Sequence, residues 1–188
     1  MTQTATNDIP DFLADLVRQD LASKTIATYK ADLTAFARWF SSTVGEPFSA
    51  RAVTPTDLRD HRGYLRMVQR RAAATVNRRF AALRAFFRWA KGKGLISELP
   101  TDDVKGVPIP RRVPKSLLKR DVDRILRAAE REGNRRNLAI VLLLRHTGLR
   151  VGELCALQVD DVVISERKGQ VHVHSGKGDK DRSVPLTK

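Results

Sequence analysis

The stretch 137–157, NLAIVLLLRHTGLRVGELCAL, decides how the second half of the chain folds. Its first part is almost wholly apolar and predicts a buried helix over 136–147, which Gly148 ends. Arg150 follows, and Glu153 comes one helical turn later, inside a shorter helix expected over 150–157. A guanidinium this close to a core is costly unless its charge has a partner. The rest of the sequence must therefore indicate what the partner of Arg150 is.

The sequence around this stretch changes its hydrophobic period from helix to strand. A helix is predicted over 119–132 before it. After it, DDVVIS, QVHVHS and RSVPL alternate apolar and polar residues, with Val171 and Val173 on one face of the middle segment. The turns ERKG and GKGDKD separate the three segments. We therefore predict a three-stranded antiparallel sheet, and we expect Cys155 of the short helix to face the core.

The first half of the chain has helical periodicity throughout. The first helix is predicted over 9–22, and the second runs from Ser23 as a cap to a stop at Gly45 and Pro47. The third helix begins at Thr54 as N-cap with Pro55 in its first turn. The fourth is predicted over 72–94. The third helix carries the apolar stripe Leu58, Tyr64, Leu65 and Val68, and the fourth carries Val76, Phe80, Leu83, Phe86, Phe87 and Ala90.

Two domains follow from this pattern. Residues 97–115 contain four prolines and no apolar period, which is the composition of a linker. We place a helical domain at 1–107, a basic linker at 108–115 and a second domain at 116–188. The fold class is therefore mainly α, with a four-helix domain followed by a partial α+β domain that holds the three-stranded sheet.

The charge of the chain points to a polyanionic partner. Thirty-five basic residues face 21 acidic ones, a net charge of +14. Residues 1–107 hold 17 basic and 11 acidic residues, and residues 108–188 hold 18 and 10. Both halves therefore carry the excess, and nucleic acid is the simplest partner.

Other features of composition narrow the class of protein. The single cysteine excludes an internal disulfide and a cysteine-rich zinc site. The first ten residues, MTQTATNDIP, have no apolar signal region, and the run AIVLLL is too short to span a bilayer. We expect a protein of the cytoplasm, associated with the nucleoid, with no membrane contact and no metal site.

The order of these motifs resembles the tyrosine recombinase, or phage integrase, family, and most of all its Xer-like members. TGLRVGELCALQVDDV at 147–162 resembles the family's first arginine motif, and GKGDKDRSVPL at 176–186 resembles its hairpin lysine motif. TIATYKADLTAF and ATVNRRFAALRAFFRWA resemble the two DNA-facing helices of its SAM-like core-binding domain. The likeness runs from about residue 9 to residue 188.

The resemblance implies a chemistry for three residues of the second domain. Enzymes of this family attack a DNA phosphodiester with a tyrosine, which gives a 3′-phosphotyrosyl link and a free 5′-hydroxyl. Arg150 corresponds to the arginine that binds the scissile phosphate, and Glu153 would hold it in position. Lys177 corresponds to the lysine that protonates the leaving oxygen, with Lys180 as its rival. A guanidinium suits the first role because it stays charged and donates two parallel hydrogen bonds.

The resemblance also implies DNA contacts in the first domain and in the linker. Helix amino ends with small hydroxyls and basic side chains bind phosphate well, although each such residue is as readily a solvated one. The densest basic patch joins residues 69–71 to the start of the fourth helix. The predicted DNA-binding residues are Thr25, Thr28, Lys30, Arg70, Arg71, Thr75, Asn77, Arg78, Arg79, Arg111, Arg112 and Lys115.

The sequence departs from the family pattern in its catalytic set. None of the four histidines has an arginine three residues later, and the only tyrosines, Tyr29 and Tyr64, lie in the predicted helical domain. Catalytic groups of this kind act as a unit, so the polypeptide by itself is not expected to cut DNA. Three interpretations stay open: a truncated form of an active recombinase, a natural DNA-binding decoy or architectural factor, and a general basic protein that binds nucleic acid, including RNA.

The expected partner is double-stranded DNA with an inverted-repeat core site. No cofactor is implied, because the phosphotyrosyl link conserves the energy of the broken bond. We expect a monomer in solution, which pairs with itself or with a full-length recombinase only on DNA.

Overall fold

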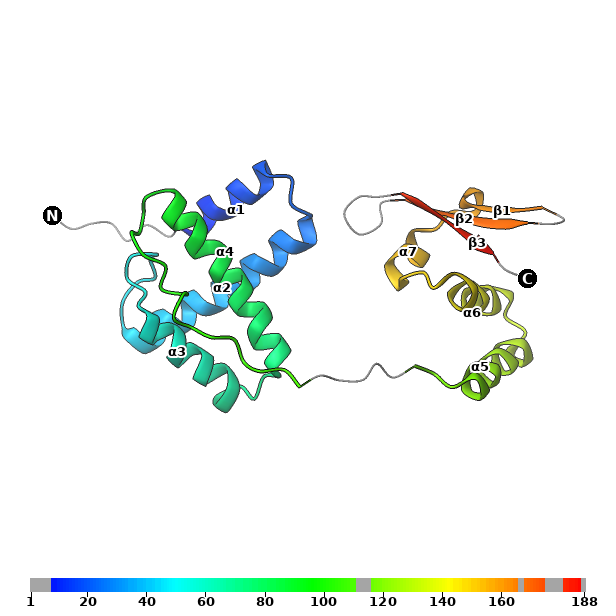
Figure 1. Cartoon of the computed structure of the whole chain (residues 1–188), viewed down its shortest axis with the longest axis horizontal. Coiled ribbons are helices and arrows are strands. Elements are labelled where there is room, and N and C mark those ends of the chain that lie inside the picture. Colours follow the sequence, from blue (N-terminus) through cyan, green and yellow to red (C-terminus); the bar gives the residue numbers. More distant parts are fainter. Residues whose placement is uncertain (1–7, 111–115, 166–167, 175–180, 187–188) are drawn as a thin grey trace. The chain divides into compact units, whose positions relative to one another are not determined.

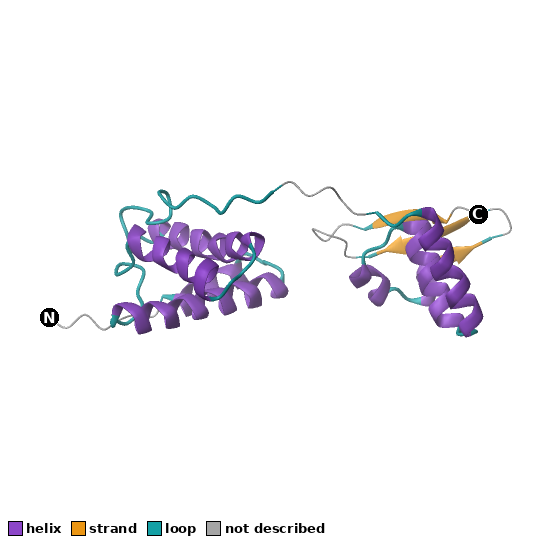
Figure 2. Ribbon diagram, turned by 90° about the horizontal axis from the view of Figure 1, so that it is seen from below, coloured by secondary structure: helices purple, strands orange, loops and turns teal. Residues whose placement is uncertain are grey.

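The computed structural model describes residues 8–110, 116–165, 168–174 and 181–186 (Figure 1). The chain divides into two compact units, residues 1–112 and 113–188. Helices dominate the first unit, and the second combines helices with a small sheet (Figure 2). Among the described residues no helix combines the length and the apolar character needed to cross a membrane.

The described residues of the first unit form four α-helices and one π-helical turn. A long extended segment follows the last helix and runs back over the unit (Figure 1). The elements are α1 (Ile9–Arg18), α2 (Ser23–Val44), α3 (Pro55–Gly63), the π turn η1 (Tyr64–Val68) and α4 (Ala73–Gly92).

Local sequence signals set several of these helix ends. The Thr54 hydroxyl accepts a hydrogen bond from the Asp57 amide at 3.3 Å, and the Asp57 carboxylate accepts one from the Thr54 amide at 2.8 Å. This capping box starts α3, and the predicted N-cap at Thr54 with Pro55 in the first turn is confirmed. Gly45 ends α2 in the left-handed region, with φ of +83°. The prediction for Ser23 is wrong, because Ala22 takes the cap position and no side chain caps the helix.

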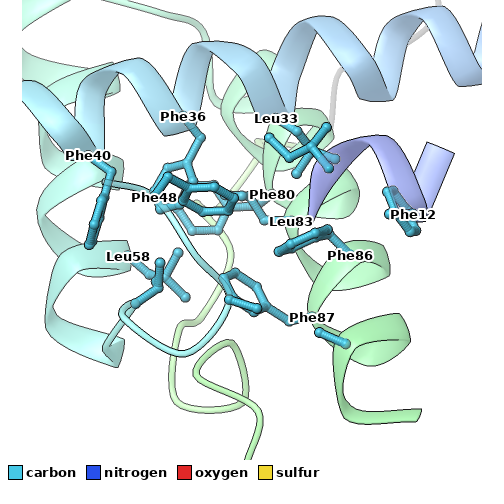
Figure 3. Packing of buried hydrophobic residues seen from close by; sticks show 14 of the residues in the cluster. Phe12, Leu33, Phe36, Phe40, Phe48, Leu58, Phe80, Leu83, Phe86 and Phe87 are labelled. Carbon is cyan, nitrogen blue, oxygen red and sulfur yellow. The ribbon is translucent and has the colours of Figure 1, made fainter. Parts of the chain in front are cut away.

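The core of the first unit is rich in phenylalanine (Figure 3). All six residues predicted for the inner face of α4 are buried, which confirms its periodicity. Phe12 of α1 meets Phe86 edge-on with 5.6 Å between ring centroids, and Phe36 of α2 meets Phe48 in the same way at 5.8 Å. Such edge-to-face pairs add to the stability gained from buried area.

The segment after α4 packs on the helical unit further than its composition predicts. The side chain of Val104 joins the aromatic core, and Thr101 is buried as well. Arg84 donates a hydrogen bond to the carbonyl of Val104 at 3.0 Å. Residues 97–107 thus have the composition of a linker and yet pack on the helical unit, because apolar side chains at irregular spacing can be buried without a helical period.

In the part of the second unit that the structure describes, three α-helices join an antiparallel sheet. The strands lie in the order β1–β2–β3, and Val171 pairs with Val162 on one side and with Val184 on the other. The elements are α5 (Lys119–Glu132), α6 (Arg135–Thr147), α7 (Val151–Ala156), the 3-10 turn η2 (Val159–Asp161), β1 (Val162–Ile164), β2 (Gly169–Val173) and β3 (Arg182–Leu186).

The core of the second unit is small. It forms around Leu149, Val171 and Val173, so the predicted alternation in the middle strand is confirmed. Two other predictions are wrong. No residue of α6 is buried, although all of that helix is described, because only part of its surface packs on the sheet. Cys155 is exposed, since α7 meets the core through the neighbouring position, Leu154.

His61 of α3 lies in an aromatic cage. It is 3 % exposed, and its ring centroid is 4.9 Å from that of Phe36 and 4.6 Å from that of Trp39. Within the described part of the chain, its Nδ1 atom has no hydrogen-bond partner. Burial, and to a smaller degree the charge of Arg79, lower the pKa of His61 to about 4. The imidazole is therefore neutral in the folded protein at neutral pH.

This neutral histidine predicts that the helical unit loses stability in mild acid. The unfolded chain takes up the proton near pH 6.5 and the folded chain near pH 4, so stability falls as the pH drops through this window. The full loss is on the order of 3 kcal/mol. Urea unfolding at pH 7 and pH 5 measures the larger part of this loss through the fluorescence of Trp39 and Trp89, which both lie in this unit.

Two variants test the origin of the effect. His61→Phe should make the urea midpoint nearly independent of pH over this range, because the aromatic ring fits the cage without titrating. His146→Gln, in the other unit, should keep the wild-type dependence. Equal midpoints for the wild-type protein at both pH values would contradict the assignment.

Candidate nucleic-acid interface

The junction between α6 and α7 turns Arg150 outward. Gly148 ends α6 in the left-handed region with φ of +62°, a conformation that costs a glycine little. Leu149 then enters the core, and Arg150 takes the N-cap position of α7 with its side chain 63 % exposed. The hydroxyl of Thr147 holds the bend, because it donates to the carbonyl of Leu143 and accepts from the amide of Leu149.

Glu153 forms an ion pair with Arg150 in the structure. Its carboxylate accepts hydrogen bonds from the backbone amide of Arg150 at 2.8 Å and from Nη1 of the same residue at 2.8 Å. The Glu153 side chain is only 9 % exposed, whereas the guanidinium of Arg150 faces solvent. The carboxylate therefore fixes the orientation of a cation whose outer face is open.

A second arginine, Arg182 at the start of β3, shares the same carboxylate. Its Nη1 and Nη2 atoms donate to the two oxygens of Glu153 at 2.9 and 2.8 Å. These bonds, and then the backbone amide of Arg150, hold the pKa of Glu153 far below its usual value. The same contact raises the pKa of Arg182. One buried carboxylate thus carries two guanidinium groups.

Sequence reasoning missed Arg182 as part of this cluster. The signal available was a charged residue that opens the predicted strand RSVPL directly after the turn GKGDKD. Its position opposite Val173 in the β2–β3 register brings it to α7, and that register is a property of the folded sheet.

His174 lies at the end of β2, where the hairpin begins. Its Nδ1 atom is 3.3 Å from the carboxylate of Asp181, and its Nε2 atom is 3.1 Å from that of Asp161. These carboxylates, Asp181 first, raise the pKa of His174. The two candidate lysines of the hairpin, Lys177 and Lys180, lie outside the described residues.

In the helical unit, a second buried carboxylate orders two predicted DNA-binding arginines. Arg78 forms a two-pronged ion pair with Asp32 of α2, and its Nη2 atom donates at 3.1 Å. Nε of Arg79 lies 3.7 Å from the same carboxylate. The side chain of Arg78 is about half exposed and that of Arg79 is mostly buried. Of the two, Arg78 is the one with open surface.

Asn77 binds the segment that follows α4. Its side-chain amide donates to the carbonyl of Val107 at 2.8 Å, and its oxygen accepts from the amide of Val107 at 2.8 Å. Gly106 allows this approach, since a Cβ there would lie 3.3 Å from the Asn77 oxygen. Arg62 also donates to the carbonyl of Lys105. The chain therefore leaves the helical unit beside the first turns of α4.

The structure brings together only some of the predicted DNA-binding residues. Asn77 and Arg78 share the start of α4 with Thr75, and Arg70 and Arg71 lie in the turn just before it. Thr28 lies one turn before Asp32 on α2, near the amino-terminal end that Thr25 shares, and its hydroxyl donates to the carbonyl of Lys24.

The remaining predicted DNA-binding residues either lie away from the start of α4 or fall outside the residues that the structure describes. Lys30 lies on another side of α2, where it lines a groove together with Thr34, Arg38 and Ile9. Arg111, Arg112 and Lys115 lie outside the described residues.

Comparisons with known proteins follow the division into two units. Residues 9–94 match the model of the phage integrase N-terminal SAM-like domain, and residues 115–188 match the model of the phage integrase family. The tyrosine recombinase XerD of Ralstonia nicotianae is 34 % identical over 186 residues, which are 97 % of this chain and 58 % of that protein. The tyrosine recombinase XerC of Neisseria meningitidis serogroup C is 34 % identical over 183 residues, with 94 % and 58 % covered.

Solved structures show the same fold. A lambda integrase(75-356) dimer bound to a COC′ core site has a TM-score of 0.71 at 20 % identity, and the match covers 97 % of this chain and 60 % of that one. XerH bound to a palindromic difH substrate has a TM-score of 0.69 at 19 % identity, with 90 % and 50 % covered. The chain spans less than two thirds of the relatives and structures described here.

A SAM-like helical unit ahead of a phage-integrase unit, together with relatives that are tyrosine recombinases, identifies the class as that of the tyrosine recombinases. The chain belongs to the phage integrase family. The predicted fold class and the resemblance on which it rested are thus confirmed.

The shared carboxylate predicts slow motion of two arginine side chains. With Glu153 in place, the guanidinium groups of Arg150 and Arg182 should rotate slowly about their Cζ–N bonds, and ¹⁵N-labelled arginine should give separate Nη resonances for both. Glu153→Gln should average both sets, because an amide offers one acceptor and no charge. Asp123→Asn, which frees Arg145 instead, should leave them separate. Averaged resonances in the wild-type protein would contradict the cluster.

The contact between Asn77 and Val107 predicts a protected cleavage site. Asn77→Ala should release the backbone around Lys105 and make trypsin cut after this exposed lysine several times faster than in the wild-type protein. Mass spectrometry of the fragments gives the rate at this bond. Asn137→Ala, which removes an amide from the other unit, should not change it. An unchanged rate in Asn77→Ala would mean that other contacts hold the segment.

Proposed function

We propose that this chain binds double-stranded DNA at an inverted-repeat core site and serves site-specific recombination through a 3′-phosphotyrosyl intermediate. The single observation that carries the proposal is Arg150, held from behind by Glu153 with its outer face open. Arg150 is not needed to neutralise Glu153, because Arg182 already gives that carboxylate two hydrogen bonds. The charge of Arg150 is therefore available for a partner outside the chain.

The chemistry assigned to Arg150 is phosphate binding. Its free N–H groups would donate to the non-bridging oxygens of the scissile phosphate and oppose the charge that builds as a tyrosine oxygen attacks phosphorus. Because Glu153 fixes the guanidinium before DNA arrives, little side-chain entropy is lost on binding. Lys177 is assigned the proton that the leaving 5′-oxygen takes up, as its place in the GKG motif suggests.

We also propose that these residues do not supply the attacking tyrosine. Tyr29 and Tyr64 both pack against the aromatic core of the helical unit. The hydroxyl of Tyr64 accepts a hydrogen bond from Gln69 at 3.2 Å, so it serves the turn in which it lies. The chain on its own is thus a DNA-binding form, and strand cleavage needs a tyrosine from elsewhere.

The partners follow from the same reasoning. The structural relatives described above include a dimer bound to a core site and a recombinase bound to a palindromic substrate. With a net charge of +14, free copies of this chain repel one another, and a DNA duplex removes that repulsion. We propose pairing on DNA with a second copy or with a full-length recombinase, on the DNA of the nucleoid in the cytoplasm.

The salt dependence of DNA binding tests the role of Arg150. For a duplex, each phosphate contact contributes about 0.9 to the slope of log K against log salt concentration. Arg150→Ala should lower this slope by about one contact, or roughly 0.9. Arg120→Ala removes the same charge from an exposed site on α5 and should lower the slope less. Fluorescence anisotropy with a labelled duplex gives both slopes. Equal slopes for the two variants would remove Arg150 from the interface.

A second comparison separates recombination-site binding from general binding of nucleic acid. Duplexes selected from a random pool by the wild-type chain should contain an inverted repeat, and an RNA duplex of the same sequence should compete poorly. A general basic protein would select no sequence and would bind DNA and RNA alike. A decoy or architectural factor would select the same repeat as a recombinase, and it would stay inactive when a full-length partner supplies the tyrosine.

A further inference from the structure

The turn between α3 and α4 exposes two adjacent apolar side chains. Met67 is 80 % exposed and Val68 is 68 % exposed, and among the described residues of the helical unit they are the two most exposed large apolar side chains. The sequence predicted Val68 as part of the apolar stripe that faces the core, and this prediction is wrong. The structure gives a local reason for the exposure.

The reason is the π-helical turn η1. The amide of Gln69 donates to the carbonyl of Tyr64, five residues earlier, at 3.0 Å. This wider turn changes the angular spacing of side chains, so the residue three positions after the buried Leu65 no longer faces the core. Met67 and Val68 therefore point to solvent together, on the surface that leads into α4.

The turn is fixed rather than loose. The amide of Arg71 donates to the carbonyl of Leu65 at 2.9 Å, and Gln69 donates to the hydroxyl of Tyr64. Arg70 has φ of +50°, a left-handed conformation that costs a residue with a side chain about 1–3 kcal/mol and persists where surrounding contacts enforce it. Both π turns and such strained residues concentrate at functional sites.

Three exposed arginines frame the apolar pair. Arg66 donates to the carbonyl of Arg71 at 2.9 Å, and Arg71 contacts Gln69, so both side chains are tied to the turn. Arg70 lies between them in sequence, and α4 with Arg78 follows directly. A partner that fits this surface must carry dense negative charge together with an apolar group.

We propose that Met67 and Val68 enter the major groove of DNA and pack on thymine methyl groups, while the neighbouring arginines hold the phosphates. The inference rests on the proposed function, because it assumes that the helical unit binds duplex DNA. The major groove is where a duplex displays an apolar group, the thymine methyl, between two charged backbones. The contact gives base preference, which arginine–phosphate contacts do not supply.

The experiment starts from a duplex selected from a random pool by the full 188-residue chain. Met67→Ser with Val68→Ser should lower the affinity for the selected duplex roughly tenfold, and should leave the affinity for a scrambled duplex and its salt slope unchanged. Val17→Ser with Val44→Ser removes two other exposed apolar residues of the unit and should change neither affinity. Circular dichroism confirms that all variants are folded.

A change in the DNA tests the same contact from the other side. Deoxyuridine in place of thymine removes the methyl group and keeps the hydrogen-bonding pattern. Replacing thymine by deoxyuridine at one or two positions of the selected duplex should lower the affinity of the wild-type chain. The same replacements should cause no further loss of affinity in the double variant of Met67 and Val68.

The outcomes distinguish this inference from the proposed function. Equal losses on selected and scrambled duplexes, or no loss on either, would overturn the thymine contact while site-specific binding stands. Unchanged DNA affinity with weaker pairing of two bound chains would overturn it in favour of a contact between proteins. If the wild-type chain selects no sequence at all, the proposed function and this inference both fail.

Discussion

The second unit depends on one carboxylate that serves two guanidinium groups. Glu153 is nearly buried, and it accepts hydrogen bonds from the backbone and side chain of Arg150 and from both ends of the Arg182 fork. A buried charge without partners would be unstable, so the fold holds α7 and β3 where they satisfy it. The resulting cluster has a net positive charge, and its open side is Arg150. A cation fixed in this way is ready for an anion before the anion arrives.

The helical unit uses the same device in its own core. Asp32 is a buried carboxylate on α2 that accepts from Arg78 of α4, with Arg79 close by. Each carboxylate thus links two elements, α7 with β3 and α2 with α4, and holds at least one guanidinium that keeps an exposed face. The physical consequence is common to both units: acidic residues fix the basic surface from behind, so the excess of positive charge is ordered as well as large. Ordered charge loses less side-chain entropy on binding DNA than the same charge on free side chains.

Much of the fold could be predicted from local pattern. The inner face of α4, the N-cap at Thr54, the glycine that ends α2 and the alternation around Val171 were all predicted correctly, because each depends on residues within a single element. The predictions failed where the burial expected from helical periodicity did not match how the helix turns or packs in the folded chain. Val68 follows the helical period but a π turn rotates it outward, and Cys155 belongs to a helix too short to have a second buried side.

By itself, the sequence determined the order of elements, the excess of basic residues and the motifs that place the chain in its family. It also offered Arg150 and Glu153 as neighbours, since three residues in a helix turn are close whatever the rest of the chain does. Only the tertiary structure decided that Arg182 joins them, that Asn77 binds Val107, and that Arg79 is mostly buried. Those contacts join residues that lie far apart in sequence or depend on how helices pack. Hydrophobic periodicity indicates which face of a helix or strand is buried. It carries no information about which polar groups of two elements will contact each other once the elements pack.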